Sequence, residues 1–311
     1  MKNKTGLCLI LTLLFFASAA LRAELESSAS AEMQLDSYDE RKADTDKVPL
    51  DIFETETGYS FETDLNHGGK VGRQDAWQNE IEYAHRFLVS GNWYLRAGVA
   101  YNRFDFGNTP APVPVHLQSG AFVIGIDYMK GKDLGAFIQF KPGFYTEEHI
   151  GLAAFDCPIT AARFFVLQEH KLYLLVGANA SFLRGSWPVI PVAGLVWIPC
   201  DKWRLMGVPP EPRLVYSPND KLELWIGGEF VGGSFRTDHQ NDIMPAKLSG
   251  AVVDYSDYRA GVGLRYSLND HIDLDLGGGC SVQRDFNFER ADQYFRTDPA
   301  PYVRIEFKAK F

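Results

Sequence analysis

The chain has 311 residues, a formal net charge of −9 and a mean hydropathy of −0.17, with 28 glycines and 14% aromatic residues. Its basic residues are scattered along the chain, which argues against nucleic acid as a partner. Abundant glycine and aromatic side chains at this hydropathy are typical of a β-barrel with a lipid-facing exterior and a polar interior. A secreted soluble β-protein would share this composition.

The N-terminus has the three parts of a secretory signal peptide. Two lysines form a basic start, an apolar run covers residues 7–17, and small residues follow at Ala19, Ala20 and Ala23. We predict a signal peptide over residues 1–23, cleaved after one of those three alanines. The apolar run is about eleven residues, shorter than the ~20 of a spanning helix, and no other stretch approaches that length without charges. Helical membrane spans are therefore not expected.

Residues 24–50 and 51–311 differ in character. The first segment is acidic, contains serines and has almost no aromatic residues, so it buries too little surface to fold alone. We predict a disordered periplasmic N-terminal extension. In the second segment, aromatic-rich runs alternate in polarity and are separated by turn residues. This pattern predicts an all-β domain, a transmembrane antiparallel β-barrel.

Fourteen runs have the length and composition of strands. They are Ile52–Thr63, Asp75–Val89, Asn92–Phe104, Leu117–Met129, Leu134–Thr146, Pro158–Gln168, Leu172–Leu183, Pro191–Pro199, Trp203–Val208, Arg213–Ser217, Lys221–Phe235, Val252–Ser267, His271–Asn287 and Pro301–Phe311. Trp203–Val208 and Arg213–Ser217 are shorter than the ~9–11 residues that span a bilayer. Prolines 209, 210 and 212 separate them, and proline cannot donate to a strand ladder. We therefore expect these two runs to form a rim, and prefer twelve spanning strands to the alternative of fourteen.

Alternation along the strands predicts two faces. In the last run, Val303, Ile305 and Phe307 point one way and Arg304 and Glu306 the other, because successive side chains alternate. A soluble sandwich would show the same alternation with its apolar face inward. Two further features favour the membrane barrel: short turns alternate with longer links, and aromatic residues gather at strand ends as in interfacial girdles. These aromatic residues are Trp93, Tyr94, Phe104, Phe106, Phe144, Tyr145, Trp187, Trp203, Phe286 and Phe288.

The last strand ends on an aromatic residue. Val303, Ile305, Phe307 and Phe311 alternate along it and resemble the C-terminal signal by which Gram-negative outer-membrane proteins are handed to the barrel assembly machinery. We therefore expect location in the outer membrane of a Gram-negative bacterium. The expected partners are outer-membrane lipid and that machinery, while a solute or surface partner is left unnamed.

Charges of both signs fall on the faces predicted to point inward. An interior lined in this way can be crossed by ion pairs, because unpaired charges in a narrow lumen are costly. Arg259, Arg265 and Arg304 are expected to face Asp273, Asp275 and Glu306. The full predicted lumen charge network is Glu80, Glu82, Arg86, Arg96, Arg259, Arg265, Asp273, Asp275, Arg304 and Glu306.

Three segments in the last two thirds of the chain carry a family resemblance. They are Asp254–Tyr266, Gly277–Gly279 leading to Arg284–Phe288, and Pro212–Tyr216 leading to Leu222–Gly228. In these strand and turn patterns the chain resembles an uncharacterised family of bacterial outer-membrane β-barrels, a domain of unknown function. The resemblance implies a fold and no catalytic or binding residues.

No motif for chemistry stands out. The histidines lack metal-ligand spacing and there is no GxSxG motif, so we expect no catalytic residues, cofactor or metal. His239 with Asp238 and Asp242 is the best local arrangement for a hydrolase, since a carboxylate can orient an imidazole. The leading hypothesis is a non-enzymatic, narrow solute pore. The alternatives are a structural or surface-interaction barrel that displays extracellular loops, and a membrane-embedded barrel hydrolase.

Overall fold

Alternating apolar and polar side chains fold the chain into long antiparallel strands. The structure is a computed structural model that describes residues 48–130, 133–185, 187–239 and 244–311. The predicted signal peptide and most of the predicted extension lie outside the described residues. No helix in the described ranges is both long and apolar enough to cross a membrane.

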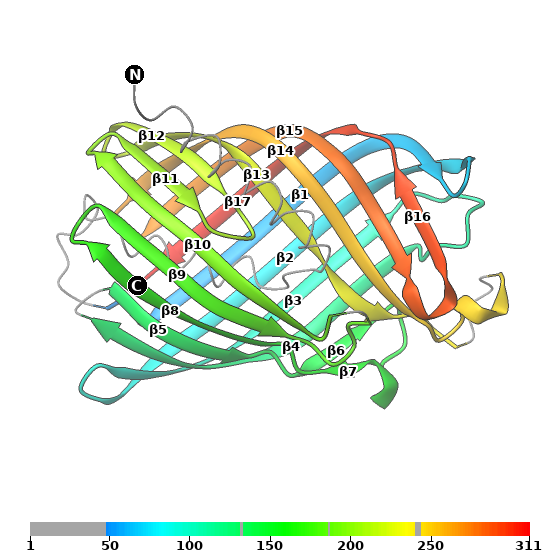
Figure 1. The fold of residues 1–311 in the computed structure, drawn as a ribbon, viewed down its shortest axis with the longest axis horizontal. Coiled ribbons are helices and arrows are strands. Elements are labelled where there is room, and N and C mark those ends of the chain that lie inside the picture. The colour runs from blue at the N-terminus through cyan, green and yellow to red at the C-terminus, as the bar shows by residue number, and fades with distance from the viewer. Residues whose placement is uncertain (1–47, 131–132, 186, 240–243) are drawn as a thin grey trace, which may run out of the picture.

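The strands close into a ring, since β1 pairs with β2 on one edge and with β17 on the other (Figure 1). Three wall strands are each interrupted once. Segments β5 and β6 both pair with β4, β7 and β8 continue one another beside them, and β16 and β17 both pair with β15. The seventeen strand segments, less these three interruptions, therefore make a wall of fourteen strands.

The segments have the following bounds: β1 Asp51–Asn66, β2 Lys70–Ser90, β3 Trp93–Phe106, β4 His116–Lys130, β5 Asp133–Phe140, β6 Gly143–Thr146, β7 Phe155–Asp156, β8 Ile159–Gln168, β9 Leu172–Ala180, β10 Val189–Cys200, β11 Trp203–Gly207, β12 Arg213–Asn219, β13 Leu222–Arg236, β14 Val252–Asn269, β15 Ile272–Phe288, β16 Gln293–Thr297 and β17 Ala300–Lys310. Short 3-10 turns lie at η3 (Leu152–Ala154), η4 (Ala246–Leu248) and η5 (Glu289–Ala291).

The preferred count of twelve strands is wrong, and the alternative of fourteen is confirmed. β11 and β12 are short, as their sequences suggest, but they are wall strands and not a rim. β11 pairs with β10, β12 pairs with β13, and the two pair with each other. The proline-rich link 208–212 stays attached because Gly228 and Phe230 donate backbone hydrogen bonds to Pro212 and Pro210. Proline cannot donate a backbone hydrogen bond, but its carbonyl still accepts one. The expectation of a rim considered only the missing donor.

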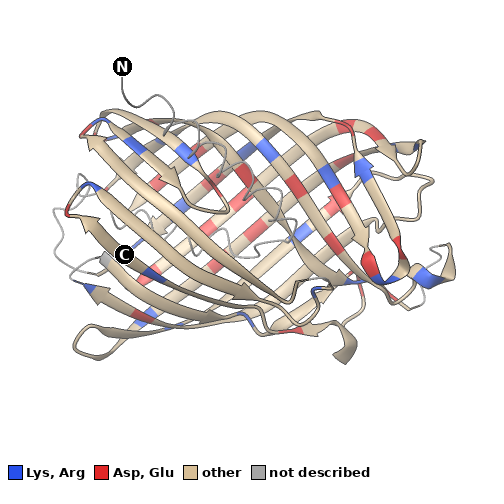
Figure 2. Cartoon of the chain, in the orientation of Figure 1, with Lys and Arg blue, Asp and Glu red and all other residues tan. Residues whose placement is uncertain are grey.

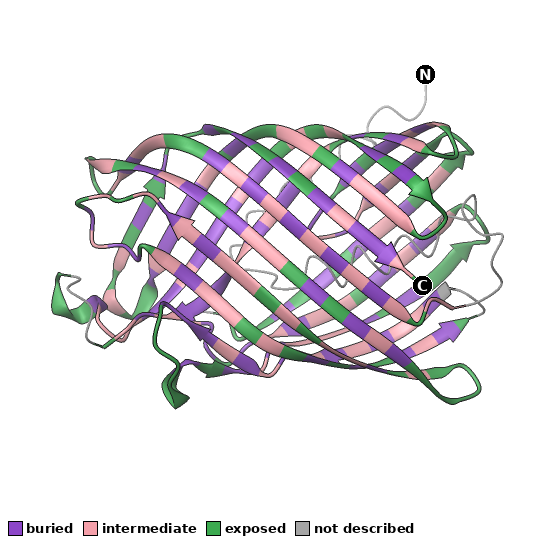
Figure 3. Ribbon diagram, turned by 180° about the vertical axis from the view of Figure 1, so that it is seen from behind, coloured by how far each residue is buried: buried purple, intermediate pink, exposed green. Residues whose placement is uncertain are grey.

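The wall has one apolar and one charged face. On β17, Val303 and Ile305 are half-exposed on the outside, whereas Arg304 and Glu306 are buried inside. Figure 2 shows charges spaced along the strands of the far wall, and Figure 3 shows buried and exposed positions alternating across the wall. Short turns lie at the end that also holds Leu50 and Phe311, which are joined by a backbone hydrogen bond. We name this end periplasmic and the end with long links extracellular.

Aromatic side chains fill the extracellular half of the interior. Phe104, Phe106, Phe286 and Phe288 are buried there with Tyr145, so these residues are not part of an interfacial girdle. Their ring centroids lie close, for example 4.9 Å between Phe106 and Phe286. They lie at strand ends in positions whose side chains point inward. The extracellular links cover them. The exposed aromatic residues of the predicted girdle are Trp93, Trp187 and Trp203.

Candidate functional site

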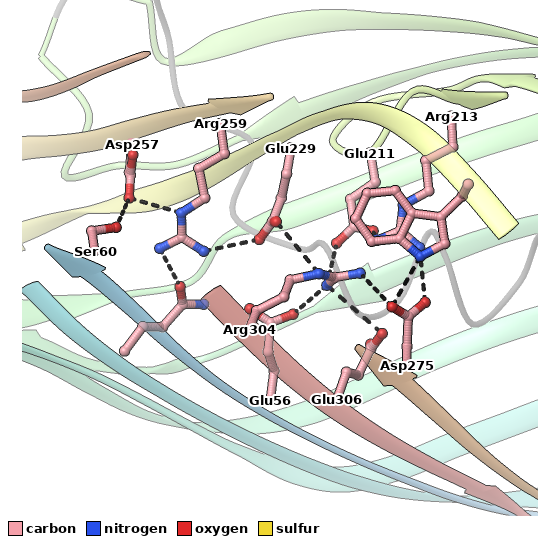
Figure 4. A network of polar contacts seen from close by, with 12 residues as sticks. Glu56, Ser60, Glu211, Arg213, Glu229, Asp257, Arg259, Asp275, Arg304 and Glu306 are labelled. Carbon is pink, nitrogen blue, oxygen red and sulfur yellow. Dashed lines mark hydrogen bonds and ion pairs between the residues drawn. The ribbon is translucent and has the colours of Figure 1, made fainter. Parts of the chain in front are cut away.

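A single arginine stands at the centre of the charged interior. The Arg304 side chain is fully buried and its Nη1 donates to Glu56 Oε2 at 2.8 Å (Figure 4). Its Nη2 lies 3.3 Å from Asp275 Oδ1. Three more carboxylates approach the same guanidinium at 3.6–3.8 Å, those of Glu211, Glu229 and Glu306. One cation is thus shared by five carboxylates from β1, β13, β15, β17 and the link 208–212.

Arg259 on β14 is the second centre of this network. Its Nε donates to Asp257 at 2.8 Å and its Nη1 to Glu229 at 3.1 Å. Its Nη2 donates to Gln78 Oε1 on β2 at 2.9 Å. Asp257 also accepts from Ser60 on β1, 3.4 Å away. We call the residues around Arg304 and Arg259 the lumen belt, because they tie strands that are not neighbours in the wall.

The structure places eight of the ten predicted lumen residues in buried inward positions: Glu82, Arg86, Arg96, Arg259, Arg265, Asp275, Arg304 and Glu306. Glu80 and Asp273 are half-buried. The partners differ in part from those expected. Arg265 and Arg304 do face Asp275, at 3.3 Å each, but Arg259 pairs with Asp257 and Glu229 and not with the expected carboxylates. Arg86 and Arg96 converge instead on Asp127 of β4, at 2.9 and 3.1 Å.

Sequence reasoning missed two members of the lumen belt near the proline-rich link. Glu211 lies within the link and forms an ion pair with Arg213 at the start of β12. The Arg213 guanidinium also stacks on the Trp225 ring, 4.4 Å from its centroid, and the Trp225 indole N–H donates to Asp275 at 3.0 Å. Three prolines around one glutamate in 208–212 suggested a break in the wall, and no sequence signal showed that this carboxylate turns inward.

A second cluster of the interior is built of apolar side chains. Thirteen buried side chains of β4, β5 and β8–β13, including the link, pack there as one cluster, which we call the apolar wall. They are Met129, Leu134, Phe137, Ala162, Phe164, Tyr173, Leu175, Val192, Val196, Met206, Val208, Val215 and Trp225. Trp225 belongs to both halves, since its ring packs in the apolar wall and its N–H bonds the lumen belt.

A pocket of about 270 Å³ opens on the extracellular links, where His149 and Asp238 line it together. Asp238 does not orient His239, the arrangement that the sequence suggested. It accepts instead from His149 Nδ1 at 2.6 Å. Asp242 lies outside the described residues. The hydrogen bond to Asp238 and the negative charge of that carboxylate raise the pKa of His149. Burial opposes ionisation of Asp238, but the bonds from His149 and Glu148 hold the pKa of Asp238 below its usual value.

The closed antiparallel ring, its apolar exterior and its charged interior define a transmembrane β-barrel. No family model matches the chain and no curated protein matches it, so the resemblance to a particular uncharacterised barrel family has no support beyond the fold.

Three barrels are among the solved structures to which the chain is similar. An outer membrane channel from Pseudomonas putida F1 has 13% identity and a TM-score of 0.46, covering 85% of this chain and 96% of that one. The toluene transporter TodX of Pseudomonas putida has 9% identity and a TM-score of 0.34, with 84% and 90% covered. The translocator domain of the autotransporter NalP from Neisseria meningitidis has 12% identity and a TM-score of 0.38, with 91% and 97% covered. We draw no functional conclusion from likeness at this level.

Proposed function

We propose that the chain is a non-enzymatic outer-membrane channel for small molecules, held closed at rest by the lumen belt. The supporting observation is the contrast between the apolar wall and the lumen belt. The apolar wall shows that this barrel can fill space with apolar side chains, yet the region around Arg304 and Arg259 is filled with ion pairs. Replacing buried ion pairs by packed apolar residues is often neutral or stabilising, so filling alone does not account for the lumen belt.

Ion pairs can close a lumen that has to open again during transport. Water that enters the lumen hydrates both partners of a pair and compensates for their separation, whereas an apolar cluster is opposed by water. Arg304 is the residue on which this closure depends most, because the carboxylates of Glu56, Glu211 and Glu229 come within 4.8 Å of one another around it. Without its charge these carboxylates repel each other.

The test is single-channel conductance in planar bilayers. We expect brief openings of the wild-type barrel, and longer, cation-selective openings of Arg304→Ala, in which the five carboxylates lose a shared cation. Arg73→Ala is the matched control, since Arg73 pairs with Glu62 at the half-exposed extracellular end. If neither wild type nor Arg304→Ala conducts, although heat-modifiable mobility shows that both are folded, the channel proposal is contradicted.

A structural barrel is the second candidate. It is favoured by the aromatic cluster that fills the extracellular half, where Phe104, Tyr255 and Phe286 are fully buried. Silence of both proteins in the conductance test would support this candidate.

A further inference from the structure

An arginine in the middle of β8 points away from the barrel interior. Its neighbours along the strand, Ala162 and Phe164, are buried in the apolar wall, whereas Arg163 is exposed. Its register partners are Ala136 on β5 and Val176 on β9, and Val176 is 45% exposed on the outer face. Because successive side chains alternate along a strand, Arg163 lies on this lipid-facing side of the wall.

The register places Arg163 well inside the apolar band of the wall. Trp197 on β10 is exposed and pairs with Leu172 next to a periplasmic turn, and tryptophan favours the membrane interface. Val176, beside Arg163, is four residues further from that turn than Leu172. At ~3.3 Å per residue and a strand tilt of ~40°, this separation puts the backbone of Arg163 ~10 Å deeper than the interface. A charge that faces lipid at this depth destabilises a barrel unless it finds a partner.

The chain itself supplies no oxygen acceptor for this guanidinium in its described part. Arg163 forms neither a hydrogen bond nor an ion pair with the described residues, and its contact is with the Phe165 ring, whose centroid lies 5.0 Å from Cζ. Such a ring attracts the cation but leaves its five N–H donors without oxygen acceptors. Other outward charges are paired within the chain, since Arg103 lies 2.7 Å from Asp105.

The contact with Phe165 also gives the direction of the side chain. Phe165 lies on the same outer face as Arg163, two residues nearer to the periplasmic turn that follows β8. The guanidinium therefore extends toward the periplasmic leaflet, as long basic side chains do when their backbone lies in the apolar region. Headgroup phosphates are the acceptors on that side, and the planar fork of arginine binds a phosphate through two parallel hydrogen bonds.

Small side chains surround Arg163 on the outer face. Ala161 and Ala178 are register partners one step further from the periplasm, and Ala136 and Ala193 lie beside Arg163 and Val176. We call the four alanines the alanine patch. Because alanine projects little from a sheet, an acyl chain can lie flat on this patch while its headgroup meets the guanidinium below. A symmetric dimer through the same patch would bring two Arg163 side chains together, and like charges repel.

We propose that Arg163 and the alanine patch form a binding site for one phospholipid of the periplasmic leaflet. The guanidinium binds the headgroup phosphate, and an acyl chain lies along Ala161 and Ala178. The phosphate thereby compensates a charge that the described chain leaves unpaired in the apolar band. This site goes beyond the proposed channel, because it lies on the outer face and does not depend on opening of the lumen.

Urea unfolding of the full barrel in two kinds of bilayer tests the site. One bilayer is phosphatidylcholine and the other is digalactosyl diacylglycerol with the same acyl chains. Both lipids are uncharged overall, and only phosphatidylcholine contains phosphate. In the galactolipid, Arg163→Leu should raise the ratio of folded to unfolded barrel at least about tenfold, because the charge has no partner there. In phosphatidylcholine the same change should raise this ratio less than about threefold, because the phosphate compensates the charge.

Arg103→Leu is the matched control, since Arg103 has its partner Asp105 within the chain. Its effect on the folded ratio should be the same in both lipids. An effect of Arg163→Leu that is also the same in both lipids, whether large or small, would overturn the site.

Native mass spectrometry of barrels released from phosphatidylcholine vesicles gives a second readout. We expect wild type to retain one phospholipid and Arg163→Leu to retain it at least about threefold less often. Ala161→Phe keeps the charge but covers the path of the acyl chain, so it should lower retention as well. Retention by Arg163→Leu equal to that of wild type would overturn the site. A wild-type dimer that Arg163→Leu dissociates in both lipids would also overturn it, because the acceptor would then come from a second copy.

Discussion

Arg259 on β14 donates a hydrogen bond to Gln78 on β2 over 2.9 Å, although three wall strands, β15, β17 and β1, lie between them in the ring. This bond crosses the lumen, whereas the hydrogen bonds of the wall join neighbouring strands. The Ser60–Asp257 bond runs beside it from β1 to β14. Hydrogen bonds across the lumen fix the distance between distant parts of the ring. Pairing of neighbouring strands alone does not fix that distance.

A double-mutant cycle of Arg259→Ala and Gln78→Ala should give a coupling of about 1.5–3 kcal/mol, the range for hydrogen bonds to charged groups. The measurement is urea unfolding of the barrel in lipid vesicles. The exposed Arg73–Glu62 pair, 3.1 Å apart, is the control and should couple by less than about 1 kcal/mol. A coupling at Arg259 as small as that of the control would mean that water fills the lumen around it.

Leu264→Arg tests which face of β14 meets lipid. Leu264 is outward and 37% exposed, and Leu268 lies on the same face beside the periplasmic turn. We expect Leu264→Arg to lower the free energy of unfolding by about 2–4 kcal/mol and Leu268→Arg by about 0–1, because the cost of a charge falls toward the interface. Equal losses in a refolding titration would show that this face is not embedded.

Gly263 and Trp225 approach each other closely inside the barrel. A Cβ on Gly263 would lie 2.3 Å from Cζ2 of Trp225, whereas a Cβ on Gly228 would meet nothing nearer than 3.5 Å. Gly263→Ala should therefore displace the indole from its bond to Asp275, shift its fluorescence and cost about 1–3 kcal/mol. Gly228→Ala should leave the emission unchanged. An unshifted spectrum of folded Gly263→Ala would contradict the packing.

Each of the fourteen predicted runs overlaps a wall strand, because alternation over a lipid-facing strand is a local pattern with period two, but two of these runs were expected to form a rim and β16 lies outside all of them. The same alternation puts the charges of the predicted lumen network on one face of each strand, and eight of these ten residues are buried in the structure. The strand count failed at β11 and β12 because two short strands were judged on their own length. What keeps them in the wall is pairing with β10 and β13, and those partners lie elsewhere in the chain.

The contacts across the lumen could not be predicted from the sequence for a related reason. Arg304 and Glu56 are adjacent only after the ring closes, and Glu211 reaches them through a link that carries no periodicity. The aromatic residues Phe104 and Phe286 show the same limit. Their position at strand ends fits a girdle or a core equally well, and the link that covers the extracellular mouth decides between the two.

Phe311 is expected to act in assembly. It is 61% exposed at the periplasmic end and its ring stacks against His271, with centroids 5.6 Å apart. Phe311→Ser should lower the amount of assembled barrel in the outer membrane, because we expect this aromatic ring both to be recognised during assembly and to anchor the strand end at the membrane interface. Phe311→Tyr, which keeps the ring, should assemble normally. Heat-modifiable mobility of membrane fractions measures both, and normal abundance of the serine variant would speak against this role.

The bond between His149 and Asp238 should make the extracellular pocket sensitive to pH. The pKa of His149 is raised by its bond to Asp238, so this contribution is complete below the ordinary pKa of histidine and is lost as pH rises through the raised value. The pKa of Asp238 is lowered, so its contribution is present above the ordinary pKa of aspartate and is lost as pH falls through the lowered value. The ion pair between His149 and Asp238 is therefore fully formed between the ordinary pKa of aspartate and the ordinary pKa of histidine.

Titration of the His149 ring by NMR in detergent micelles measures this directly. We expect the apparent pKa of His149 to lie above the ordinary histidine value and to return toward that value in Asp238→Asn. Glu148→Gln is the control, because Glu148 affects His149 through its charge and less than Asp238 does. If Asp238→Asn and Glu148→Gln shift the titration of His149 equally, general negative charge in the extracellular links holds its proton, and the 2.6 Å bond does not.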